Sequence, residues 1–264
     1  MAETQGTRRR VLITGVSGGI GQFLEGRLRD DYELVTQGRT PSTPKQEKTM
    51  RRADLESYAE ALPLMDGVDT VLHLAGSASP ESEWDDVLTA NIVGFRNVLE
   101  AAREAGVRRF VFASSNHAMG MYDRLGEWPV YSHQLPRPDS LYGVSKVFGE
   151  ALGRFYHDEF GIDFLALRIG WSTPDPMVAE EDVLRAMWLS EDDTEQVFRC
   201  AIEAPTTYGL YYAVSDNPNR RWDITNTMLE LGYRPADSWT DRAKHSERVV
   251  EGGLPAPKDW PEGS

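Results

Sequence analysis

The 264-residue sequence has a single cysteine, Cys200, and only five lysines among its 28 basic residues. One cysteine excludes an internal disulfide and any cysteine-based zinc cluster, and it gives no sign of an oxidising compartment. No run approaches the ~20 apolar residues of a membrane-spanning helix, and the opening MAETQGTRRRVLITG has no stretch of signal-peptide length. We therefore expect a soluble, cytoplasmic protein without a membrane partner. His133 and His157 stand apart in the chain, so we expect no metal site.

Positive charge is scarce, because 42 acidic residues give a formal net charge of −14. A nucleic-acid-binding surface needs the opposite sign. The one basic cluster, residues 8–10, runs straight into an apolar strand, and Arg10 is expected to cover a sheet end. We therefore expect no nucleic-acid partner. An acid-rich, lysine-poor surface suits a halophilic source, although GC-rich coding would produce the same lysine deficit.

Short apolar runs alternate with amphipathic stretches along most of the chain. The pattern predicts strands at 11–14, 33–36, 70–74, 110–113, 163–167 and 210–214, and helices at 20–28, 56–65, 84–105 and 140–160. Gly106 is expected to close the helix 84–105. Residues 40–50 carry two prolines and several charges, which predicts a loop without a core face. Strands separated by helical crossovers form a doubly wound parallel α/β sheet.

The first predicted strand ends in Thr-Gly-Val-Ser-Gly-Gly-Ile-Gly at residues 14–21, where a helix begins. Gly15 permits a sharp turn, Gly18 lets the backbone approach a pyrophosphate, and Gly21, after Ile20, allows close packing of helix on sheet. The positive end of the helix then faces the phosphates. This context predicts a dinucleotide-binding Rossmann core over 8–170. A small substrate-binding lobe with returning core elements is expected over 171–240, with a tail over 241–264.

The end of the second strand indicates which dinucleotide binds. An acidic residue there would accept hydrogen bonds from the adenosine ribose and repel a 2′-phosphate, but this chain has Gln-Gly-Arg-Thr at 37–40. Gly38 leaves room, and the Arg39 guanidinium suits a phosphate. We predict that NADP is preferred and NAD tolerated. Asp54 is expected to accept from the adenine amino group, with Leu55 beside the ring.

Tyr142 and Lys146 lie four residues apart at the start of the predicted helix 140–160, so they share one face. A phenol ionises near pH 10, and a neighbouring ammonium favours the phenolate, so the pair predicts a general base. Ser115 stands at the carboxyl end of the preceding strand, where open α/β sheets place their ligands.

Together these segments resemble an extended short-chain dehydrogenase/reductase of the epimerase/dehydratase type over about residues 8–235. The resemblance rests on the glycine loop, His-Leu-Ala-Gly at 73–76, Asn91, Ser-Ser at 114–115 and Tyr-Gly-Val-Ser-Lys at 142–146. More narrowly, Phe-Ala-Ser-Ser-Asn-His at 112–117 and Arg-Ile-Gly at 168–170 resemble the sugar 1-dehydrogenase branch. That branch includes uronate dehydrogenases and archaeal glucose-6-phosphate and pentose dehydrogenases.

The resemblance implies oxidation of the anomeric C1 hydroxyl of a cyclic sugar to a lactone, with the C1 hydride passing to the nicotinamide. Tyr142 would take the hydroxyl proton, and Ser115 would hydrogen-bond the same oxygen. Lys146 would lower the pKa of Tyr142 and bind the nicotinamide ribose, while Asn91 would hold a proton-relay water. Further implied cofactor contacts are Leu74, Ala75, Gly76 and Ile169.

The choice of sugar rests on a few side chains. The resemblance implies sugar contacts from Asn116 and His117, with Ser77 a further candidate. Trp171 stands where uronate dehydrogenases carry a serine, and Arg185 does not match cleanly the register of their carboxylate-binding arginine. Without a well-placed cation, we predict a neutral aldose such as arabinose or galactose, ahead of a uronate and then glucose 6-phosphate.

Two other interpretations stay open. One is an epimerase or dehydratase that keeps its NAD bound, against which the short chain, Arg39 and the Asn116-His117 pair argue. The other is a non-catalytic, dinucleotide-binding regulator, against which the retained Tyr142 and Lys146 argue. The resemblance also implies a homo-oligomer formed through the helices 84–105 and 140–160.

Overall fold

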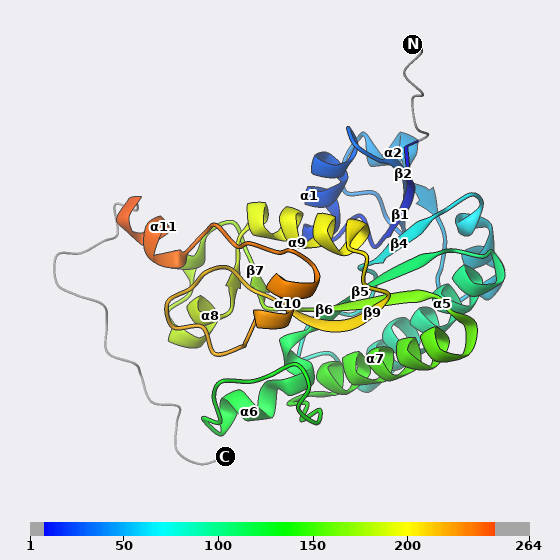
Figure 1. Cartoon of the computed structure of the whole chain (residues 1–264). Coiled ribbons are helices and arrows are strands. Elements are labelled where there is room, and N and C mark those ends of the chain that lie inside the picture. The colour runs from blue at the N-terminus through cyan, green and yellow to red at the C-terminus, as the bar shows by residue number, and fades with distance from the viewer. Residues whose placement is uncertain (1–7, 246–264) are drawn as a thin grey trace, which may run out of the picture.

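The computed structural model describes residues 8–245, which form a parallel sheet between two layers of helices (Figure 1). The strands are β1 Arg10–Thr14, β2 Glu33–Gly38, β3 Arg51–Arg52, β4 Thr70–His73, β5 Arg109–Ser115, β6 Asp163–Ile169, β7 Trp171–Ser172, β8 Trp188–Leu189 and β9 Tyr208–Ala213. The α-helices are α1 Gly19–Leu28, α2 Gln46–Thr49, α3 Tyr58–Ala61, α4 Trp84–Asp86, α5 Phe95–Glu104, α6 Gly120–Arg124, α7 Leu141–Phe160, α8 Asp182–Ala186, α9 Glu191–Glu203, α10 Thr225–Glu230 and α11 Trp239–His245. The 3₁₀ turns are η1 Leu62–Met65, η3 Asn116–Met119 and η4 Pro176–Val178, and η2 Val87–Gly94 is π-helical.

The main sheet has seven parallel strands in the order β3-β2-β1-β4-β5-β6-β9. The chain winds outward in one direction from β1 to β3 and in the other from β4 to β9. This reversal places a crevice beyond the carboxyl ends of β1 and β4, where sheets of this kind bind their ligands. The predicted doubly wound parallel α/β fold is confirmed.

Neighbouring residues of each strand face opposite helical layers. Val11 and Ile13 of β1 pack into the core that includes α1 and α9, whereas Leu12 packs into the core that includes α3 and α5. Figure 1 shows α1 and α9 on one side of the sheet and α5 and α7 on the other. Because both faces are covered, the strands read as continuous apolar runs, which made them predictable.

The predicted loop 40–50 differs from the structure, because it contains the helical turn α2 and buries two side chains. Gln46 Oε1 accepts from the Ser42 amide at 3.0 Å, and Gln46 Nε2 donates to the Val16 carbonyl at 3.2 Å. Met50 is also buried, beside Gly38. The prediction of a segment without a core face was wrong because a single amide side chain ties this segment to the glycine loop.

The predicted helix 84–105 is continuous, but its middle third is the π-helix η2. Its end is as predicted. Gly106 has a φ of +71°, the Val107 amide donates to the Ala102 carbonyl, and the Gly106 amide donates to the Arg103 carbonyl. This is a Schellman motif, which glycine favours because it adopts positive φ without strain.

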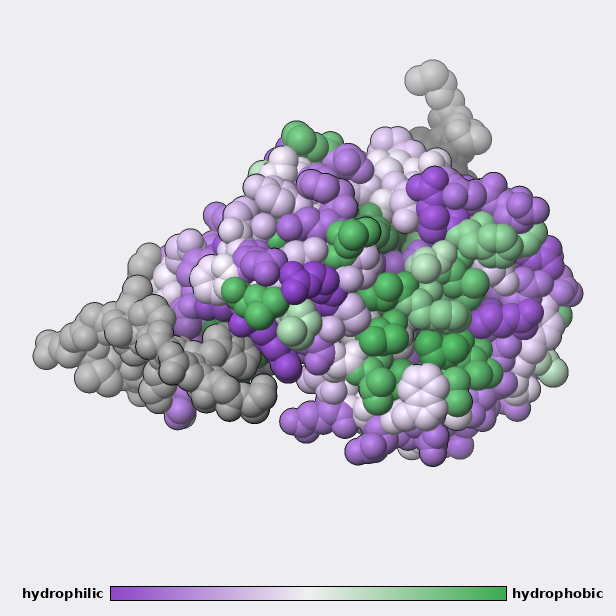
Figure 2. Space-filling model, turned by 90° about the horizontal axis from the view of Figure 1, so that it is seen from below, coloured by the Kyte–Doolittle hydropathy of each residue, from purple (hydrophilic) through white to green (hydrophobic). Residues whose placement is uncertain are grey.

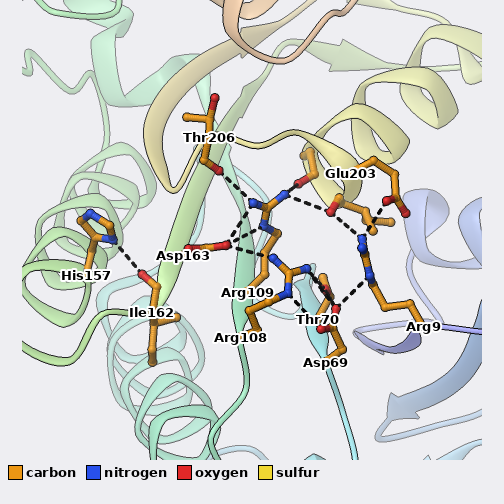
Figure 3. Close-up of polar contacts among 12 residues, drawn as sticks. Arg9, Asp69, Thr70, Arg108, Arg109, His157, Ile162, Asp163, Glu203 and Thr206 are labelled. Atoms are coloured by element: carbon orange, nitrogen blue, oxygen red, sulfur yellow. Dashed lines mark hydrogen bonds and ion pairs between the residues drawn. The ribbon is translucent and has the colours of Figure 1, made fainter.

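The amino end of the sheet is covered by a network of charged side chains (Figure 3). Arg109 is buried and donates to Asp163 Oδ2 at 3.0 Å and to three backbone carbonyls. Arg108 donates to Asp69 at 2.9 Å, and Arg9 pairs with the same carboxylate at 3.1 Å. The basic residues at this end of the sheet are therefore occupied by partners within the fold.

After β6 the chain forms the short parallel pair β7–β8 and then returns to the main sheet as β9. The division into a core over 8–170 and a lobe over 171–240 stays a prediction. Helix α11 runs across residue 240, and residues 246–264 of the predicted tail lie outside the described residues. Between residues 8 and 245, no helix combines the length and apolar character needed to span a membrane.

Candidate active site

A cleft of about 680 Å³ lies at the carboxyl ends of the parallel strands. Its walls come from the ends of β1, β2, β4, β5 and β6 and the segments that follow them. Every residue predicted to contact a dinucleotide lines it, namely Gly15, Gly18, Ile20, Gly21, Arg39, Asp54, Leu55, Leu74, Ala75, Gly76, Tyr142, Lys146 and Ile169. Ser115 and Trp171 line the same cleft. The structure thus brings together residues that are up to 156 positions apart in the sequence, from Gly15 to Trp171.

The glycine loop has the compact shape that fits a pyrophosphate, because Gly15 and Gly21 leave no room for side chains. Gly15 has a φ of +69°, and a Cβ there would lie 2.7 Å from the Ala75 backbone. A Cβ on Gly21 would lie 2.5 Å from the Gly15 carbonyl oxygen. Helix α1 begins at Gly19, so the amides of its first turn lack helical partners and remain for an anion.

The end of the cleft beside β2, where the adenosine is predicted to bind, contains a brace that the sequence did not reveal. Gln37 is buried at the end of β2, where its Oε1 accepts from the Gly15 amide at 3.1 Å and its Nε2 donates to the Ala53 carbonyl at 2.8 Å. Arg39 is exposed at the cleft and makes no hydrogen bond or ion pair with any other residue in the described part of the chain. Asp54 is exposed beside it.

Tyr142, Lys146 and Ser115 meet at the other end of the cleft. Helix α7 begins at this point because the Ser140 hydroxyl accepts from the Gly143 amide at 3.0 Å, as an N-cap does. Lys146 Nζ lies 5.3 Å from the centroid of the Tyr142 ring and donates to the Ala113 carbonyl at 2.8 Å. The predicted side chains therefore share one wall of the cleft.

Burial dominates the electrostatics of this trio. It raises the pKa of the Tyr142 phenol, although a hydrogen bond with Ser115 acts in the opposite direction. Burial also lowers the pKa of Lys146 to about 8, against the opposing effect of the Glu150 carboxylate. The pKa of Tyr142 is therefore raised, whereas the Tyr–Lys spacing had predicted that it would be lowered. The physical reason is burial, which disfavours the charged phenolate more than the hydrogen bond with Ser115 favours it.

Asn91 lies in η2 and is buried. Its Oδ1 accepts from the Ser77 amide at 2.7 Å, and its Nδ2 donates to the Ser77 carbonyl and to Ser145 Oγ, both at 2.9 Å. Asn91 is not among the residues that line the main cleft. Asn91 therefore ties the loop after β4 to α7, and its predicted relay role stays a prediction.

The predicted sugar contacts fall into two groups. Ser115, Tyr142 and Trp171 line the cleft, whereas Ser77, Asn116 and His117 are not among its lining residues. Asn116 Nδ2 lies 2.9 Å from Met187 Sδ, and His117 Nδ1 lies 2.9 Å from Asp139 Oδ2.

Arg185, the candidate for binding an anionic substrate, is also absent from the lining of the cleft. Its Nη2 donates to the Ala179 carbonyl at 2.8 Å, and its guanidinium lies 5.6 Å from the Trp239 ring centroid. Both contacts are with the segment around α8 and with α11. The structure therefore does not place this cation beside Ser115, Tyr142 and Lys146.

The sequence of this chain matches a known protein family. The model of the NAD dependent epimerase/dehydratase family matches residues 11–170. The chain belongs to this family.

Several of its relatives are sugar dehydrogenases by name. The chain is 38% identical over 257 residues to the NAD-dependent glucose-6-phosphate dehydrogenase of Haloferax volcanii, covering 91% of this chain and 98% of that protein. It is 38% identical over 251 residues to the L-arabinose 1-dehydrogenase (NAD(P)(+)) of the same organism, covering 87% and 97%. The structure of glucuronic acid dehydrogenase from Chromohalobacter salexigens matches with a TM-score of 0.83 and 34% identity, over 95% of this chain and 92% of that one. The predicted resemblance is confirmed at the level of the family and its sugar-dehydrogenase branch.

Several residues of this family member's cleft escaped the sequence prediction. Most of them follow strand ends near predicted residues, so proximity to a strand end was the available signal, whereas Ala90 and Gly94 belong to the π-helix η2. The additional lining residues are Ser17, Gly19, Gln37, Gly38, Thr40, Glu56, Ala78, Ala90, Gly94, Ala113, Ser114, Gly170 and Ser172. Among them, Ser114 donates to Glu150 at 2.6 Å, and Glu150 forms a buried ion pair with Arg168 at 2.8 Å. This network braces β5, α7 and β6 beneath Lys146.

Proposed function

We propose that this chain oxidises the anomeric C1 hydroxyl of a neutral cyclic aldose to a lactone with NADP or NAD, with arabinose and galactose as the first candidates. The observation that carries the proposal is that Ser115, Tyr142 and Lys146 line the same cleft as the glycine loop. The names of its relatives support the same reaction class, because both Haloferax proteins are sugar dehydrogenases.

The chain's own residues would prepare the sugar for oxidation. A bound nicotinamide supplies the electron acceptor. The Tyr142 phenolate takes the proton of the C1 hydroxyl, and the Ser115 hydroxyl donates to that oxygen and stabilises its developing charge. Lys146 holds positive charge 5.3 Å from the phenol ring centroid. Trp171 offers an indole face on which the apolar face of a sugar can stack.

The charges of the cleft support a neutral substrate. Arg39 and Lys146 are the basic side chains among its described lining residues. Arg39 lies at the adenosine end, Lys146 is buried beneath the phenol, and Arg185 is engaged elsewhere. The net charge of −14 also disfavours the approach of a uronate or a sugar phosphate.

A preference for NADP over NAD is part of the proposal. Gly38 occupies the end of β2, and a Cβ there would already lie 2.7 Å from Met50 Sδ and 2.9 Å from Ser17 Oγ. The cleft therefore presents no carboxylate from this position, and the unpartnered guanidinium of Arg39 suits a 2′-phosphate.

The experiment is the initial rate of nicotinamide reduction with a sugar panel, each sugar paired with NADP and with NAD. The panel contains arabinose, galactose, xylose, glucose, glucose 6-phosphate, glucuronate and galacturonate. Turnover of a neutral aldose with NADP is the expected result. Exclusive turnover of glucuronate or galacturonate would contradict the neutral-sugar proposal. Absence of turnover, together with NAD that copurifies, would favour an epimerase or dehydratase.

We also propose that two copies of the chain associate through the α7 face. Figure 2 shows hydrophobic side chains gathered on the face seen from below, where α7 lies in Figure 1. The exposed hydrophobic residues of α4, η2 and α7 are Trp84, Val93, Leu141, Val144, Phe155 and Phe160. Phe155→Glu should lower the molar mass measured by light scattering, and Leu229→Glu on α10 is the matched control. The cytoplasmic location and the halophilic source stay predictions.

A further inference from the structure

His117 and Asp139 form a partly buried pair next to the proposed general base. His117 Nδ1 lies 3.0 Å and 2.9 Å from the two carboxylate oxygens of Asp139. The His117 ring meets the Tyr142 ring edge-on, with 5.8 Å between the centroids. The His117 amide donates to Ser115 Oγ at 3.2 Å. One histidine thus contacts the base, the hydroxyl beside it and a carboxylate.

The surroundings leave this pair little freedom. A Cβ on Gly120 would overlap the Asp139 carboxylate, and a Cβ on Gly143 would overlap the His117 carbonyl. The Ser140 hydroxyl also donates to Asp139 Oδ1 at 3.1 Å. The two glycines therefore allow η3 and the start of α7 to approach closely enough for the pair to form.

The chemistry of the pair determines where the imidazole proton lies. Burial alone would raise the pKa of Asp139, but the hydrogen bond and charge of His117, the hydrogen bond from Ser140 and the charge of Arg124 together outweigh burial and hold the pKa below its usual range. An ionised carboxylate only accepts hydrogen bonds, so Nδ1 of His117 must carry a proton. In the neutral imidazole, Nε2 is then an acceptor. About a quarter of the His117 side chain is exposed.

We propose that Asp139 is a positioning residue that holds His117 with its proton on Nδ1, so that Nε2 accepts a hydrogen bond from a sugar hydroxyl near the reacting carbon. The inference rests on the proposed function and deepens it. An unprotonated Nε2 accepts a hydrogen bond from a sugar hydroxyl. The pair therefore orients the sugar ring without using a cation.

The tautomer of His117 tests the inference directly. Protein labelled with ¹⁵N-histidine is recorded by long-range ¹H–¹⁵N NMR near pH 9, and His117→Gln identifies the His117 signals among the five histidines. We expect the proton on Nδ1 in the unaltered protein. A proton on Nε2 would overturn the inference whatever the variants show.

Two substitutions extend the test to catalysis. Asp139→Leu removes the acceptor, so it should abolish the Nδ1–H preference and raise the KM of the sugar about tenfold, with the KM of the dinucleotide unchanged. Asp139→Asn keeps an oxygen acceptor, so it should retain the tautomer and restore KM to within about threefold. Asp158→Leu, at an exposed ion pair with Arg154 on α7, is the control. Equal sugar KM values in all three variants would contradict the positioning role.

The inference and the proposed function can fail separately. If no sugar of the panel is turned over, the proposed reaction is wrong, while the NMR measurement still reports whether Asp139 sets the tautomer. If a neutral aldose is oxidised by a protein whose His117 carries its proton on Nε2, the proposed reaction is supported and the positioning role of Asp139 is wrong.

Discussion

The two ends of the parallel sheet differ in whether their positively charged groups have partners within the fold. At the amino end, Arg9, Arg108 and Arg109 are paired with carboxylates and backbone carbonyls (Figure 3). At the carboxyl end, Arg39 has no partner in the described part of the chain, and helix α1 presents its first-turn amides beside Gly15. Paired charges stabilise a fold, whereas unpaired donors around a cleft are available to a ligand. Within one sheet, the charged groups at the amino end therefore stabilise the fold, and those at the carboxyl end are available for binding.

The largest effect is expected at the carboxyl end. Tyr142→Phe removes the phenolic oxygen, so kcat should fall about a thousandfold, because general-base catalysis contributes on this scale. Binding of the dinucleotide, measured by titration calorimetry, should stay within about threefold. Tyr131→Phe, at an exposed ring beside His133, is the control. Unchanged kcat in Tyr142→Phe would exclude the proposed base.

The amino end should show the opposite pattern. Arg109→Met removes the side-chain donor to the Ala201 and Thr206 carbonyls and the buried guanidinium partner of Asp163, which keeps its bond with Arg108, so the free energy of unfolding should fall by about 3 kcal/mol. Urea denaturation measures this loss, and kcat/KM of the folded fraction should not change. Arg154→Met, at an exposed pair, should cost less than about 1 kcal/mol. Equal losses in both variants would remove the distinction between the two ends.

The pH dependence of the rate reports the buried phenol. Burial raises the pKa of Tyr142, so the phenolate is a small fraction at neutral pH and grows as the pH rises. Sugar kcat/KM should therefore rise about tenfold per pH unit from pH 6 to 8. Above pH 8 the slope should decrease, because Lys146, with a pKa of about 8, loses its charge. A flat profile between pH 6 and 8 would show that Lys146 lowers the pKa of Tyr142 after all.

The smallest effect concerns the choice of dinucleotide. Arg39→Ala removes a charged donor from the adenosine end, so the KM of NADP should rise about tenfold while the KM of NAD stays the same. Arg52→Ala, which removes an exposed arginine paired with Glu47, should leave both values unchanged. Equal changes for NADP and NAD in Arg39→Ala would contradict recognition of the 2′-phosphate.

The sheet and the glycine loop could be predicted because their causes are local. Strands that are buried on both faces appear in the sequence as continuous apolar runs. The spacing of the glycines after β1 is also visible in the sequence, and the structure gives the steric reason for Gly15 and Gly21. The spacing of Tyr142 and Lys146 likewise placed both residues on one face of α7.

The remaining features depend on tertiary packing. Gln37 and Gln46 stand next to other polar residues in the sequence, so nothing there indicates that they are buried. Only the folded chain shows that both hydrogen-bond the backbone of the glycine loop. The direction of the pKa shift at Tyr142 depends on how deeply the phenol is buried, which spacing does not reveal. Asp139 precedes the cap of α7, and its contact with His117 spans 22 residues.

The central claim is oxidation at the anomeric carbon, and the most direct test follows that carbon. Galactose and arabinose labelled with ¹³C at C1 are incubated with the protein and NADP, and ¹³C NMR is recorded alongside NADPH absorbance. We predict that the C1 signal moves to that of a lactone carbonyl, with one NADPH formed per lactone. A labelled sugar that changes configuration without net NADPH formation would contradict the account and identify an epimerase.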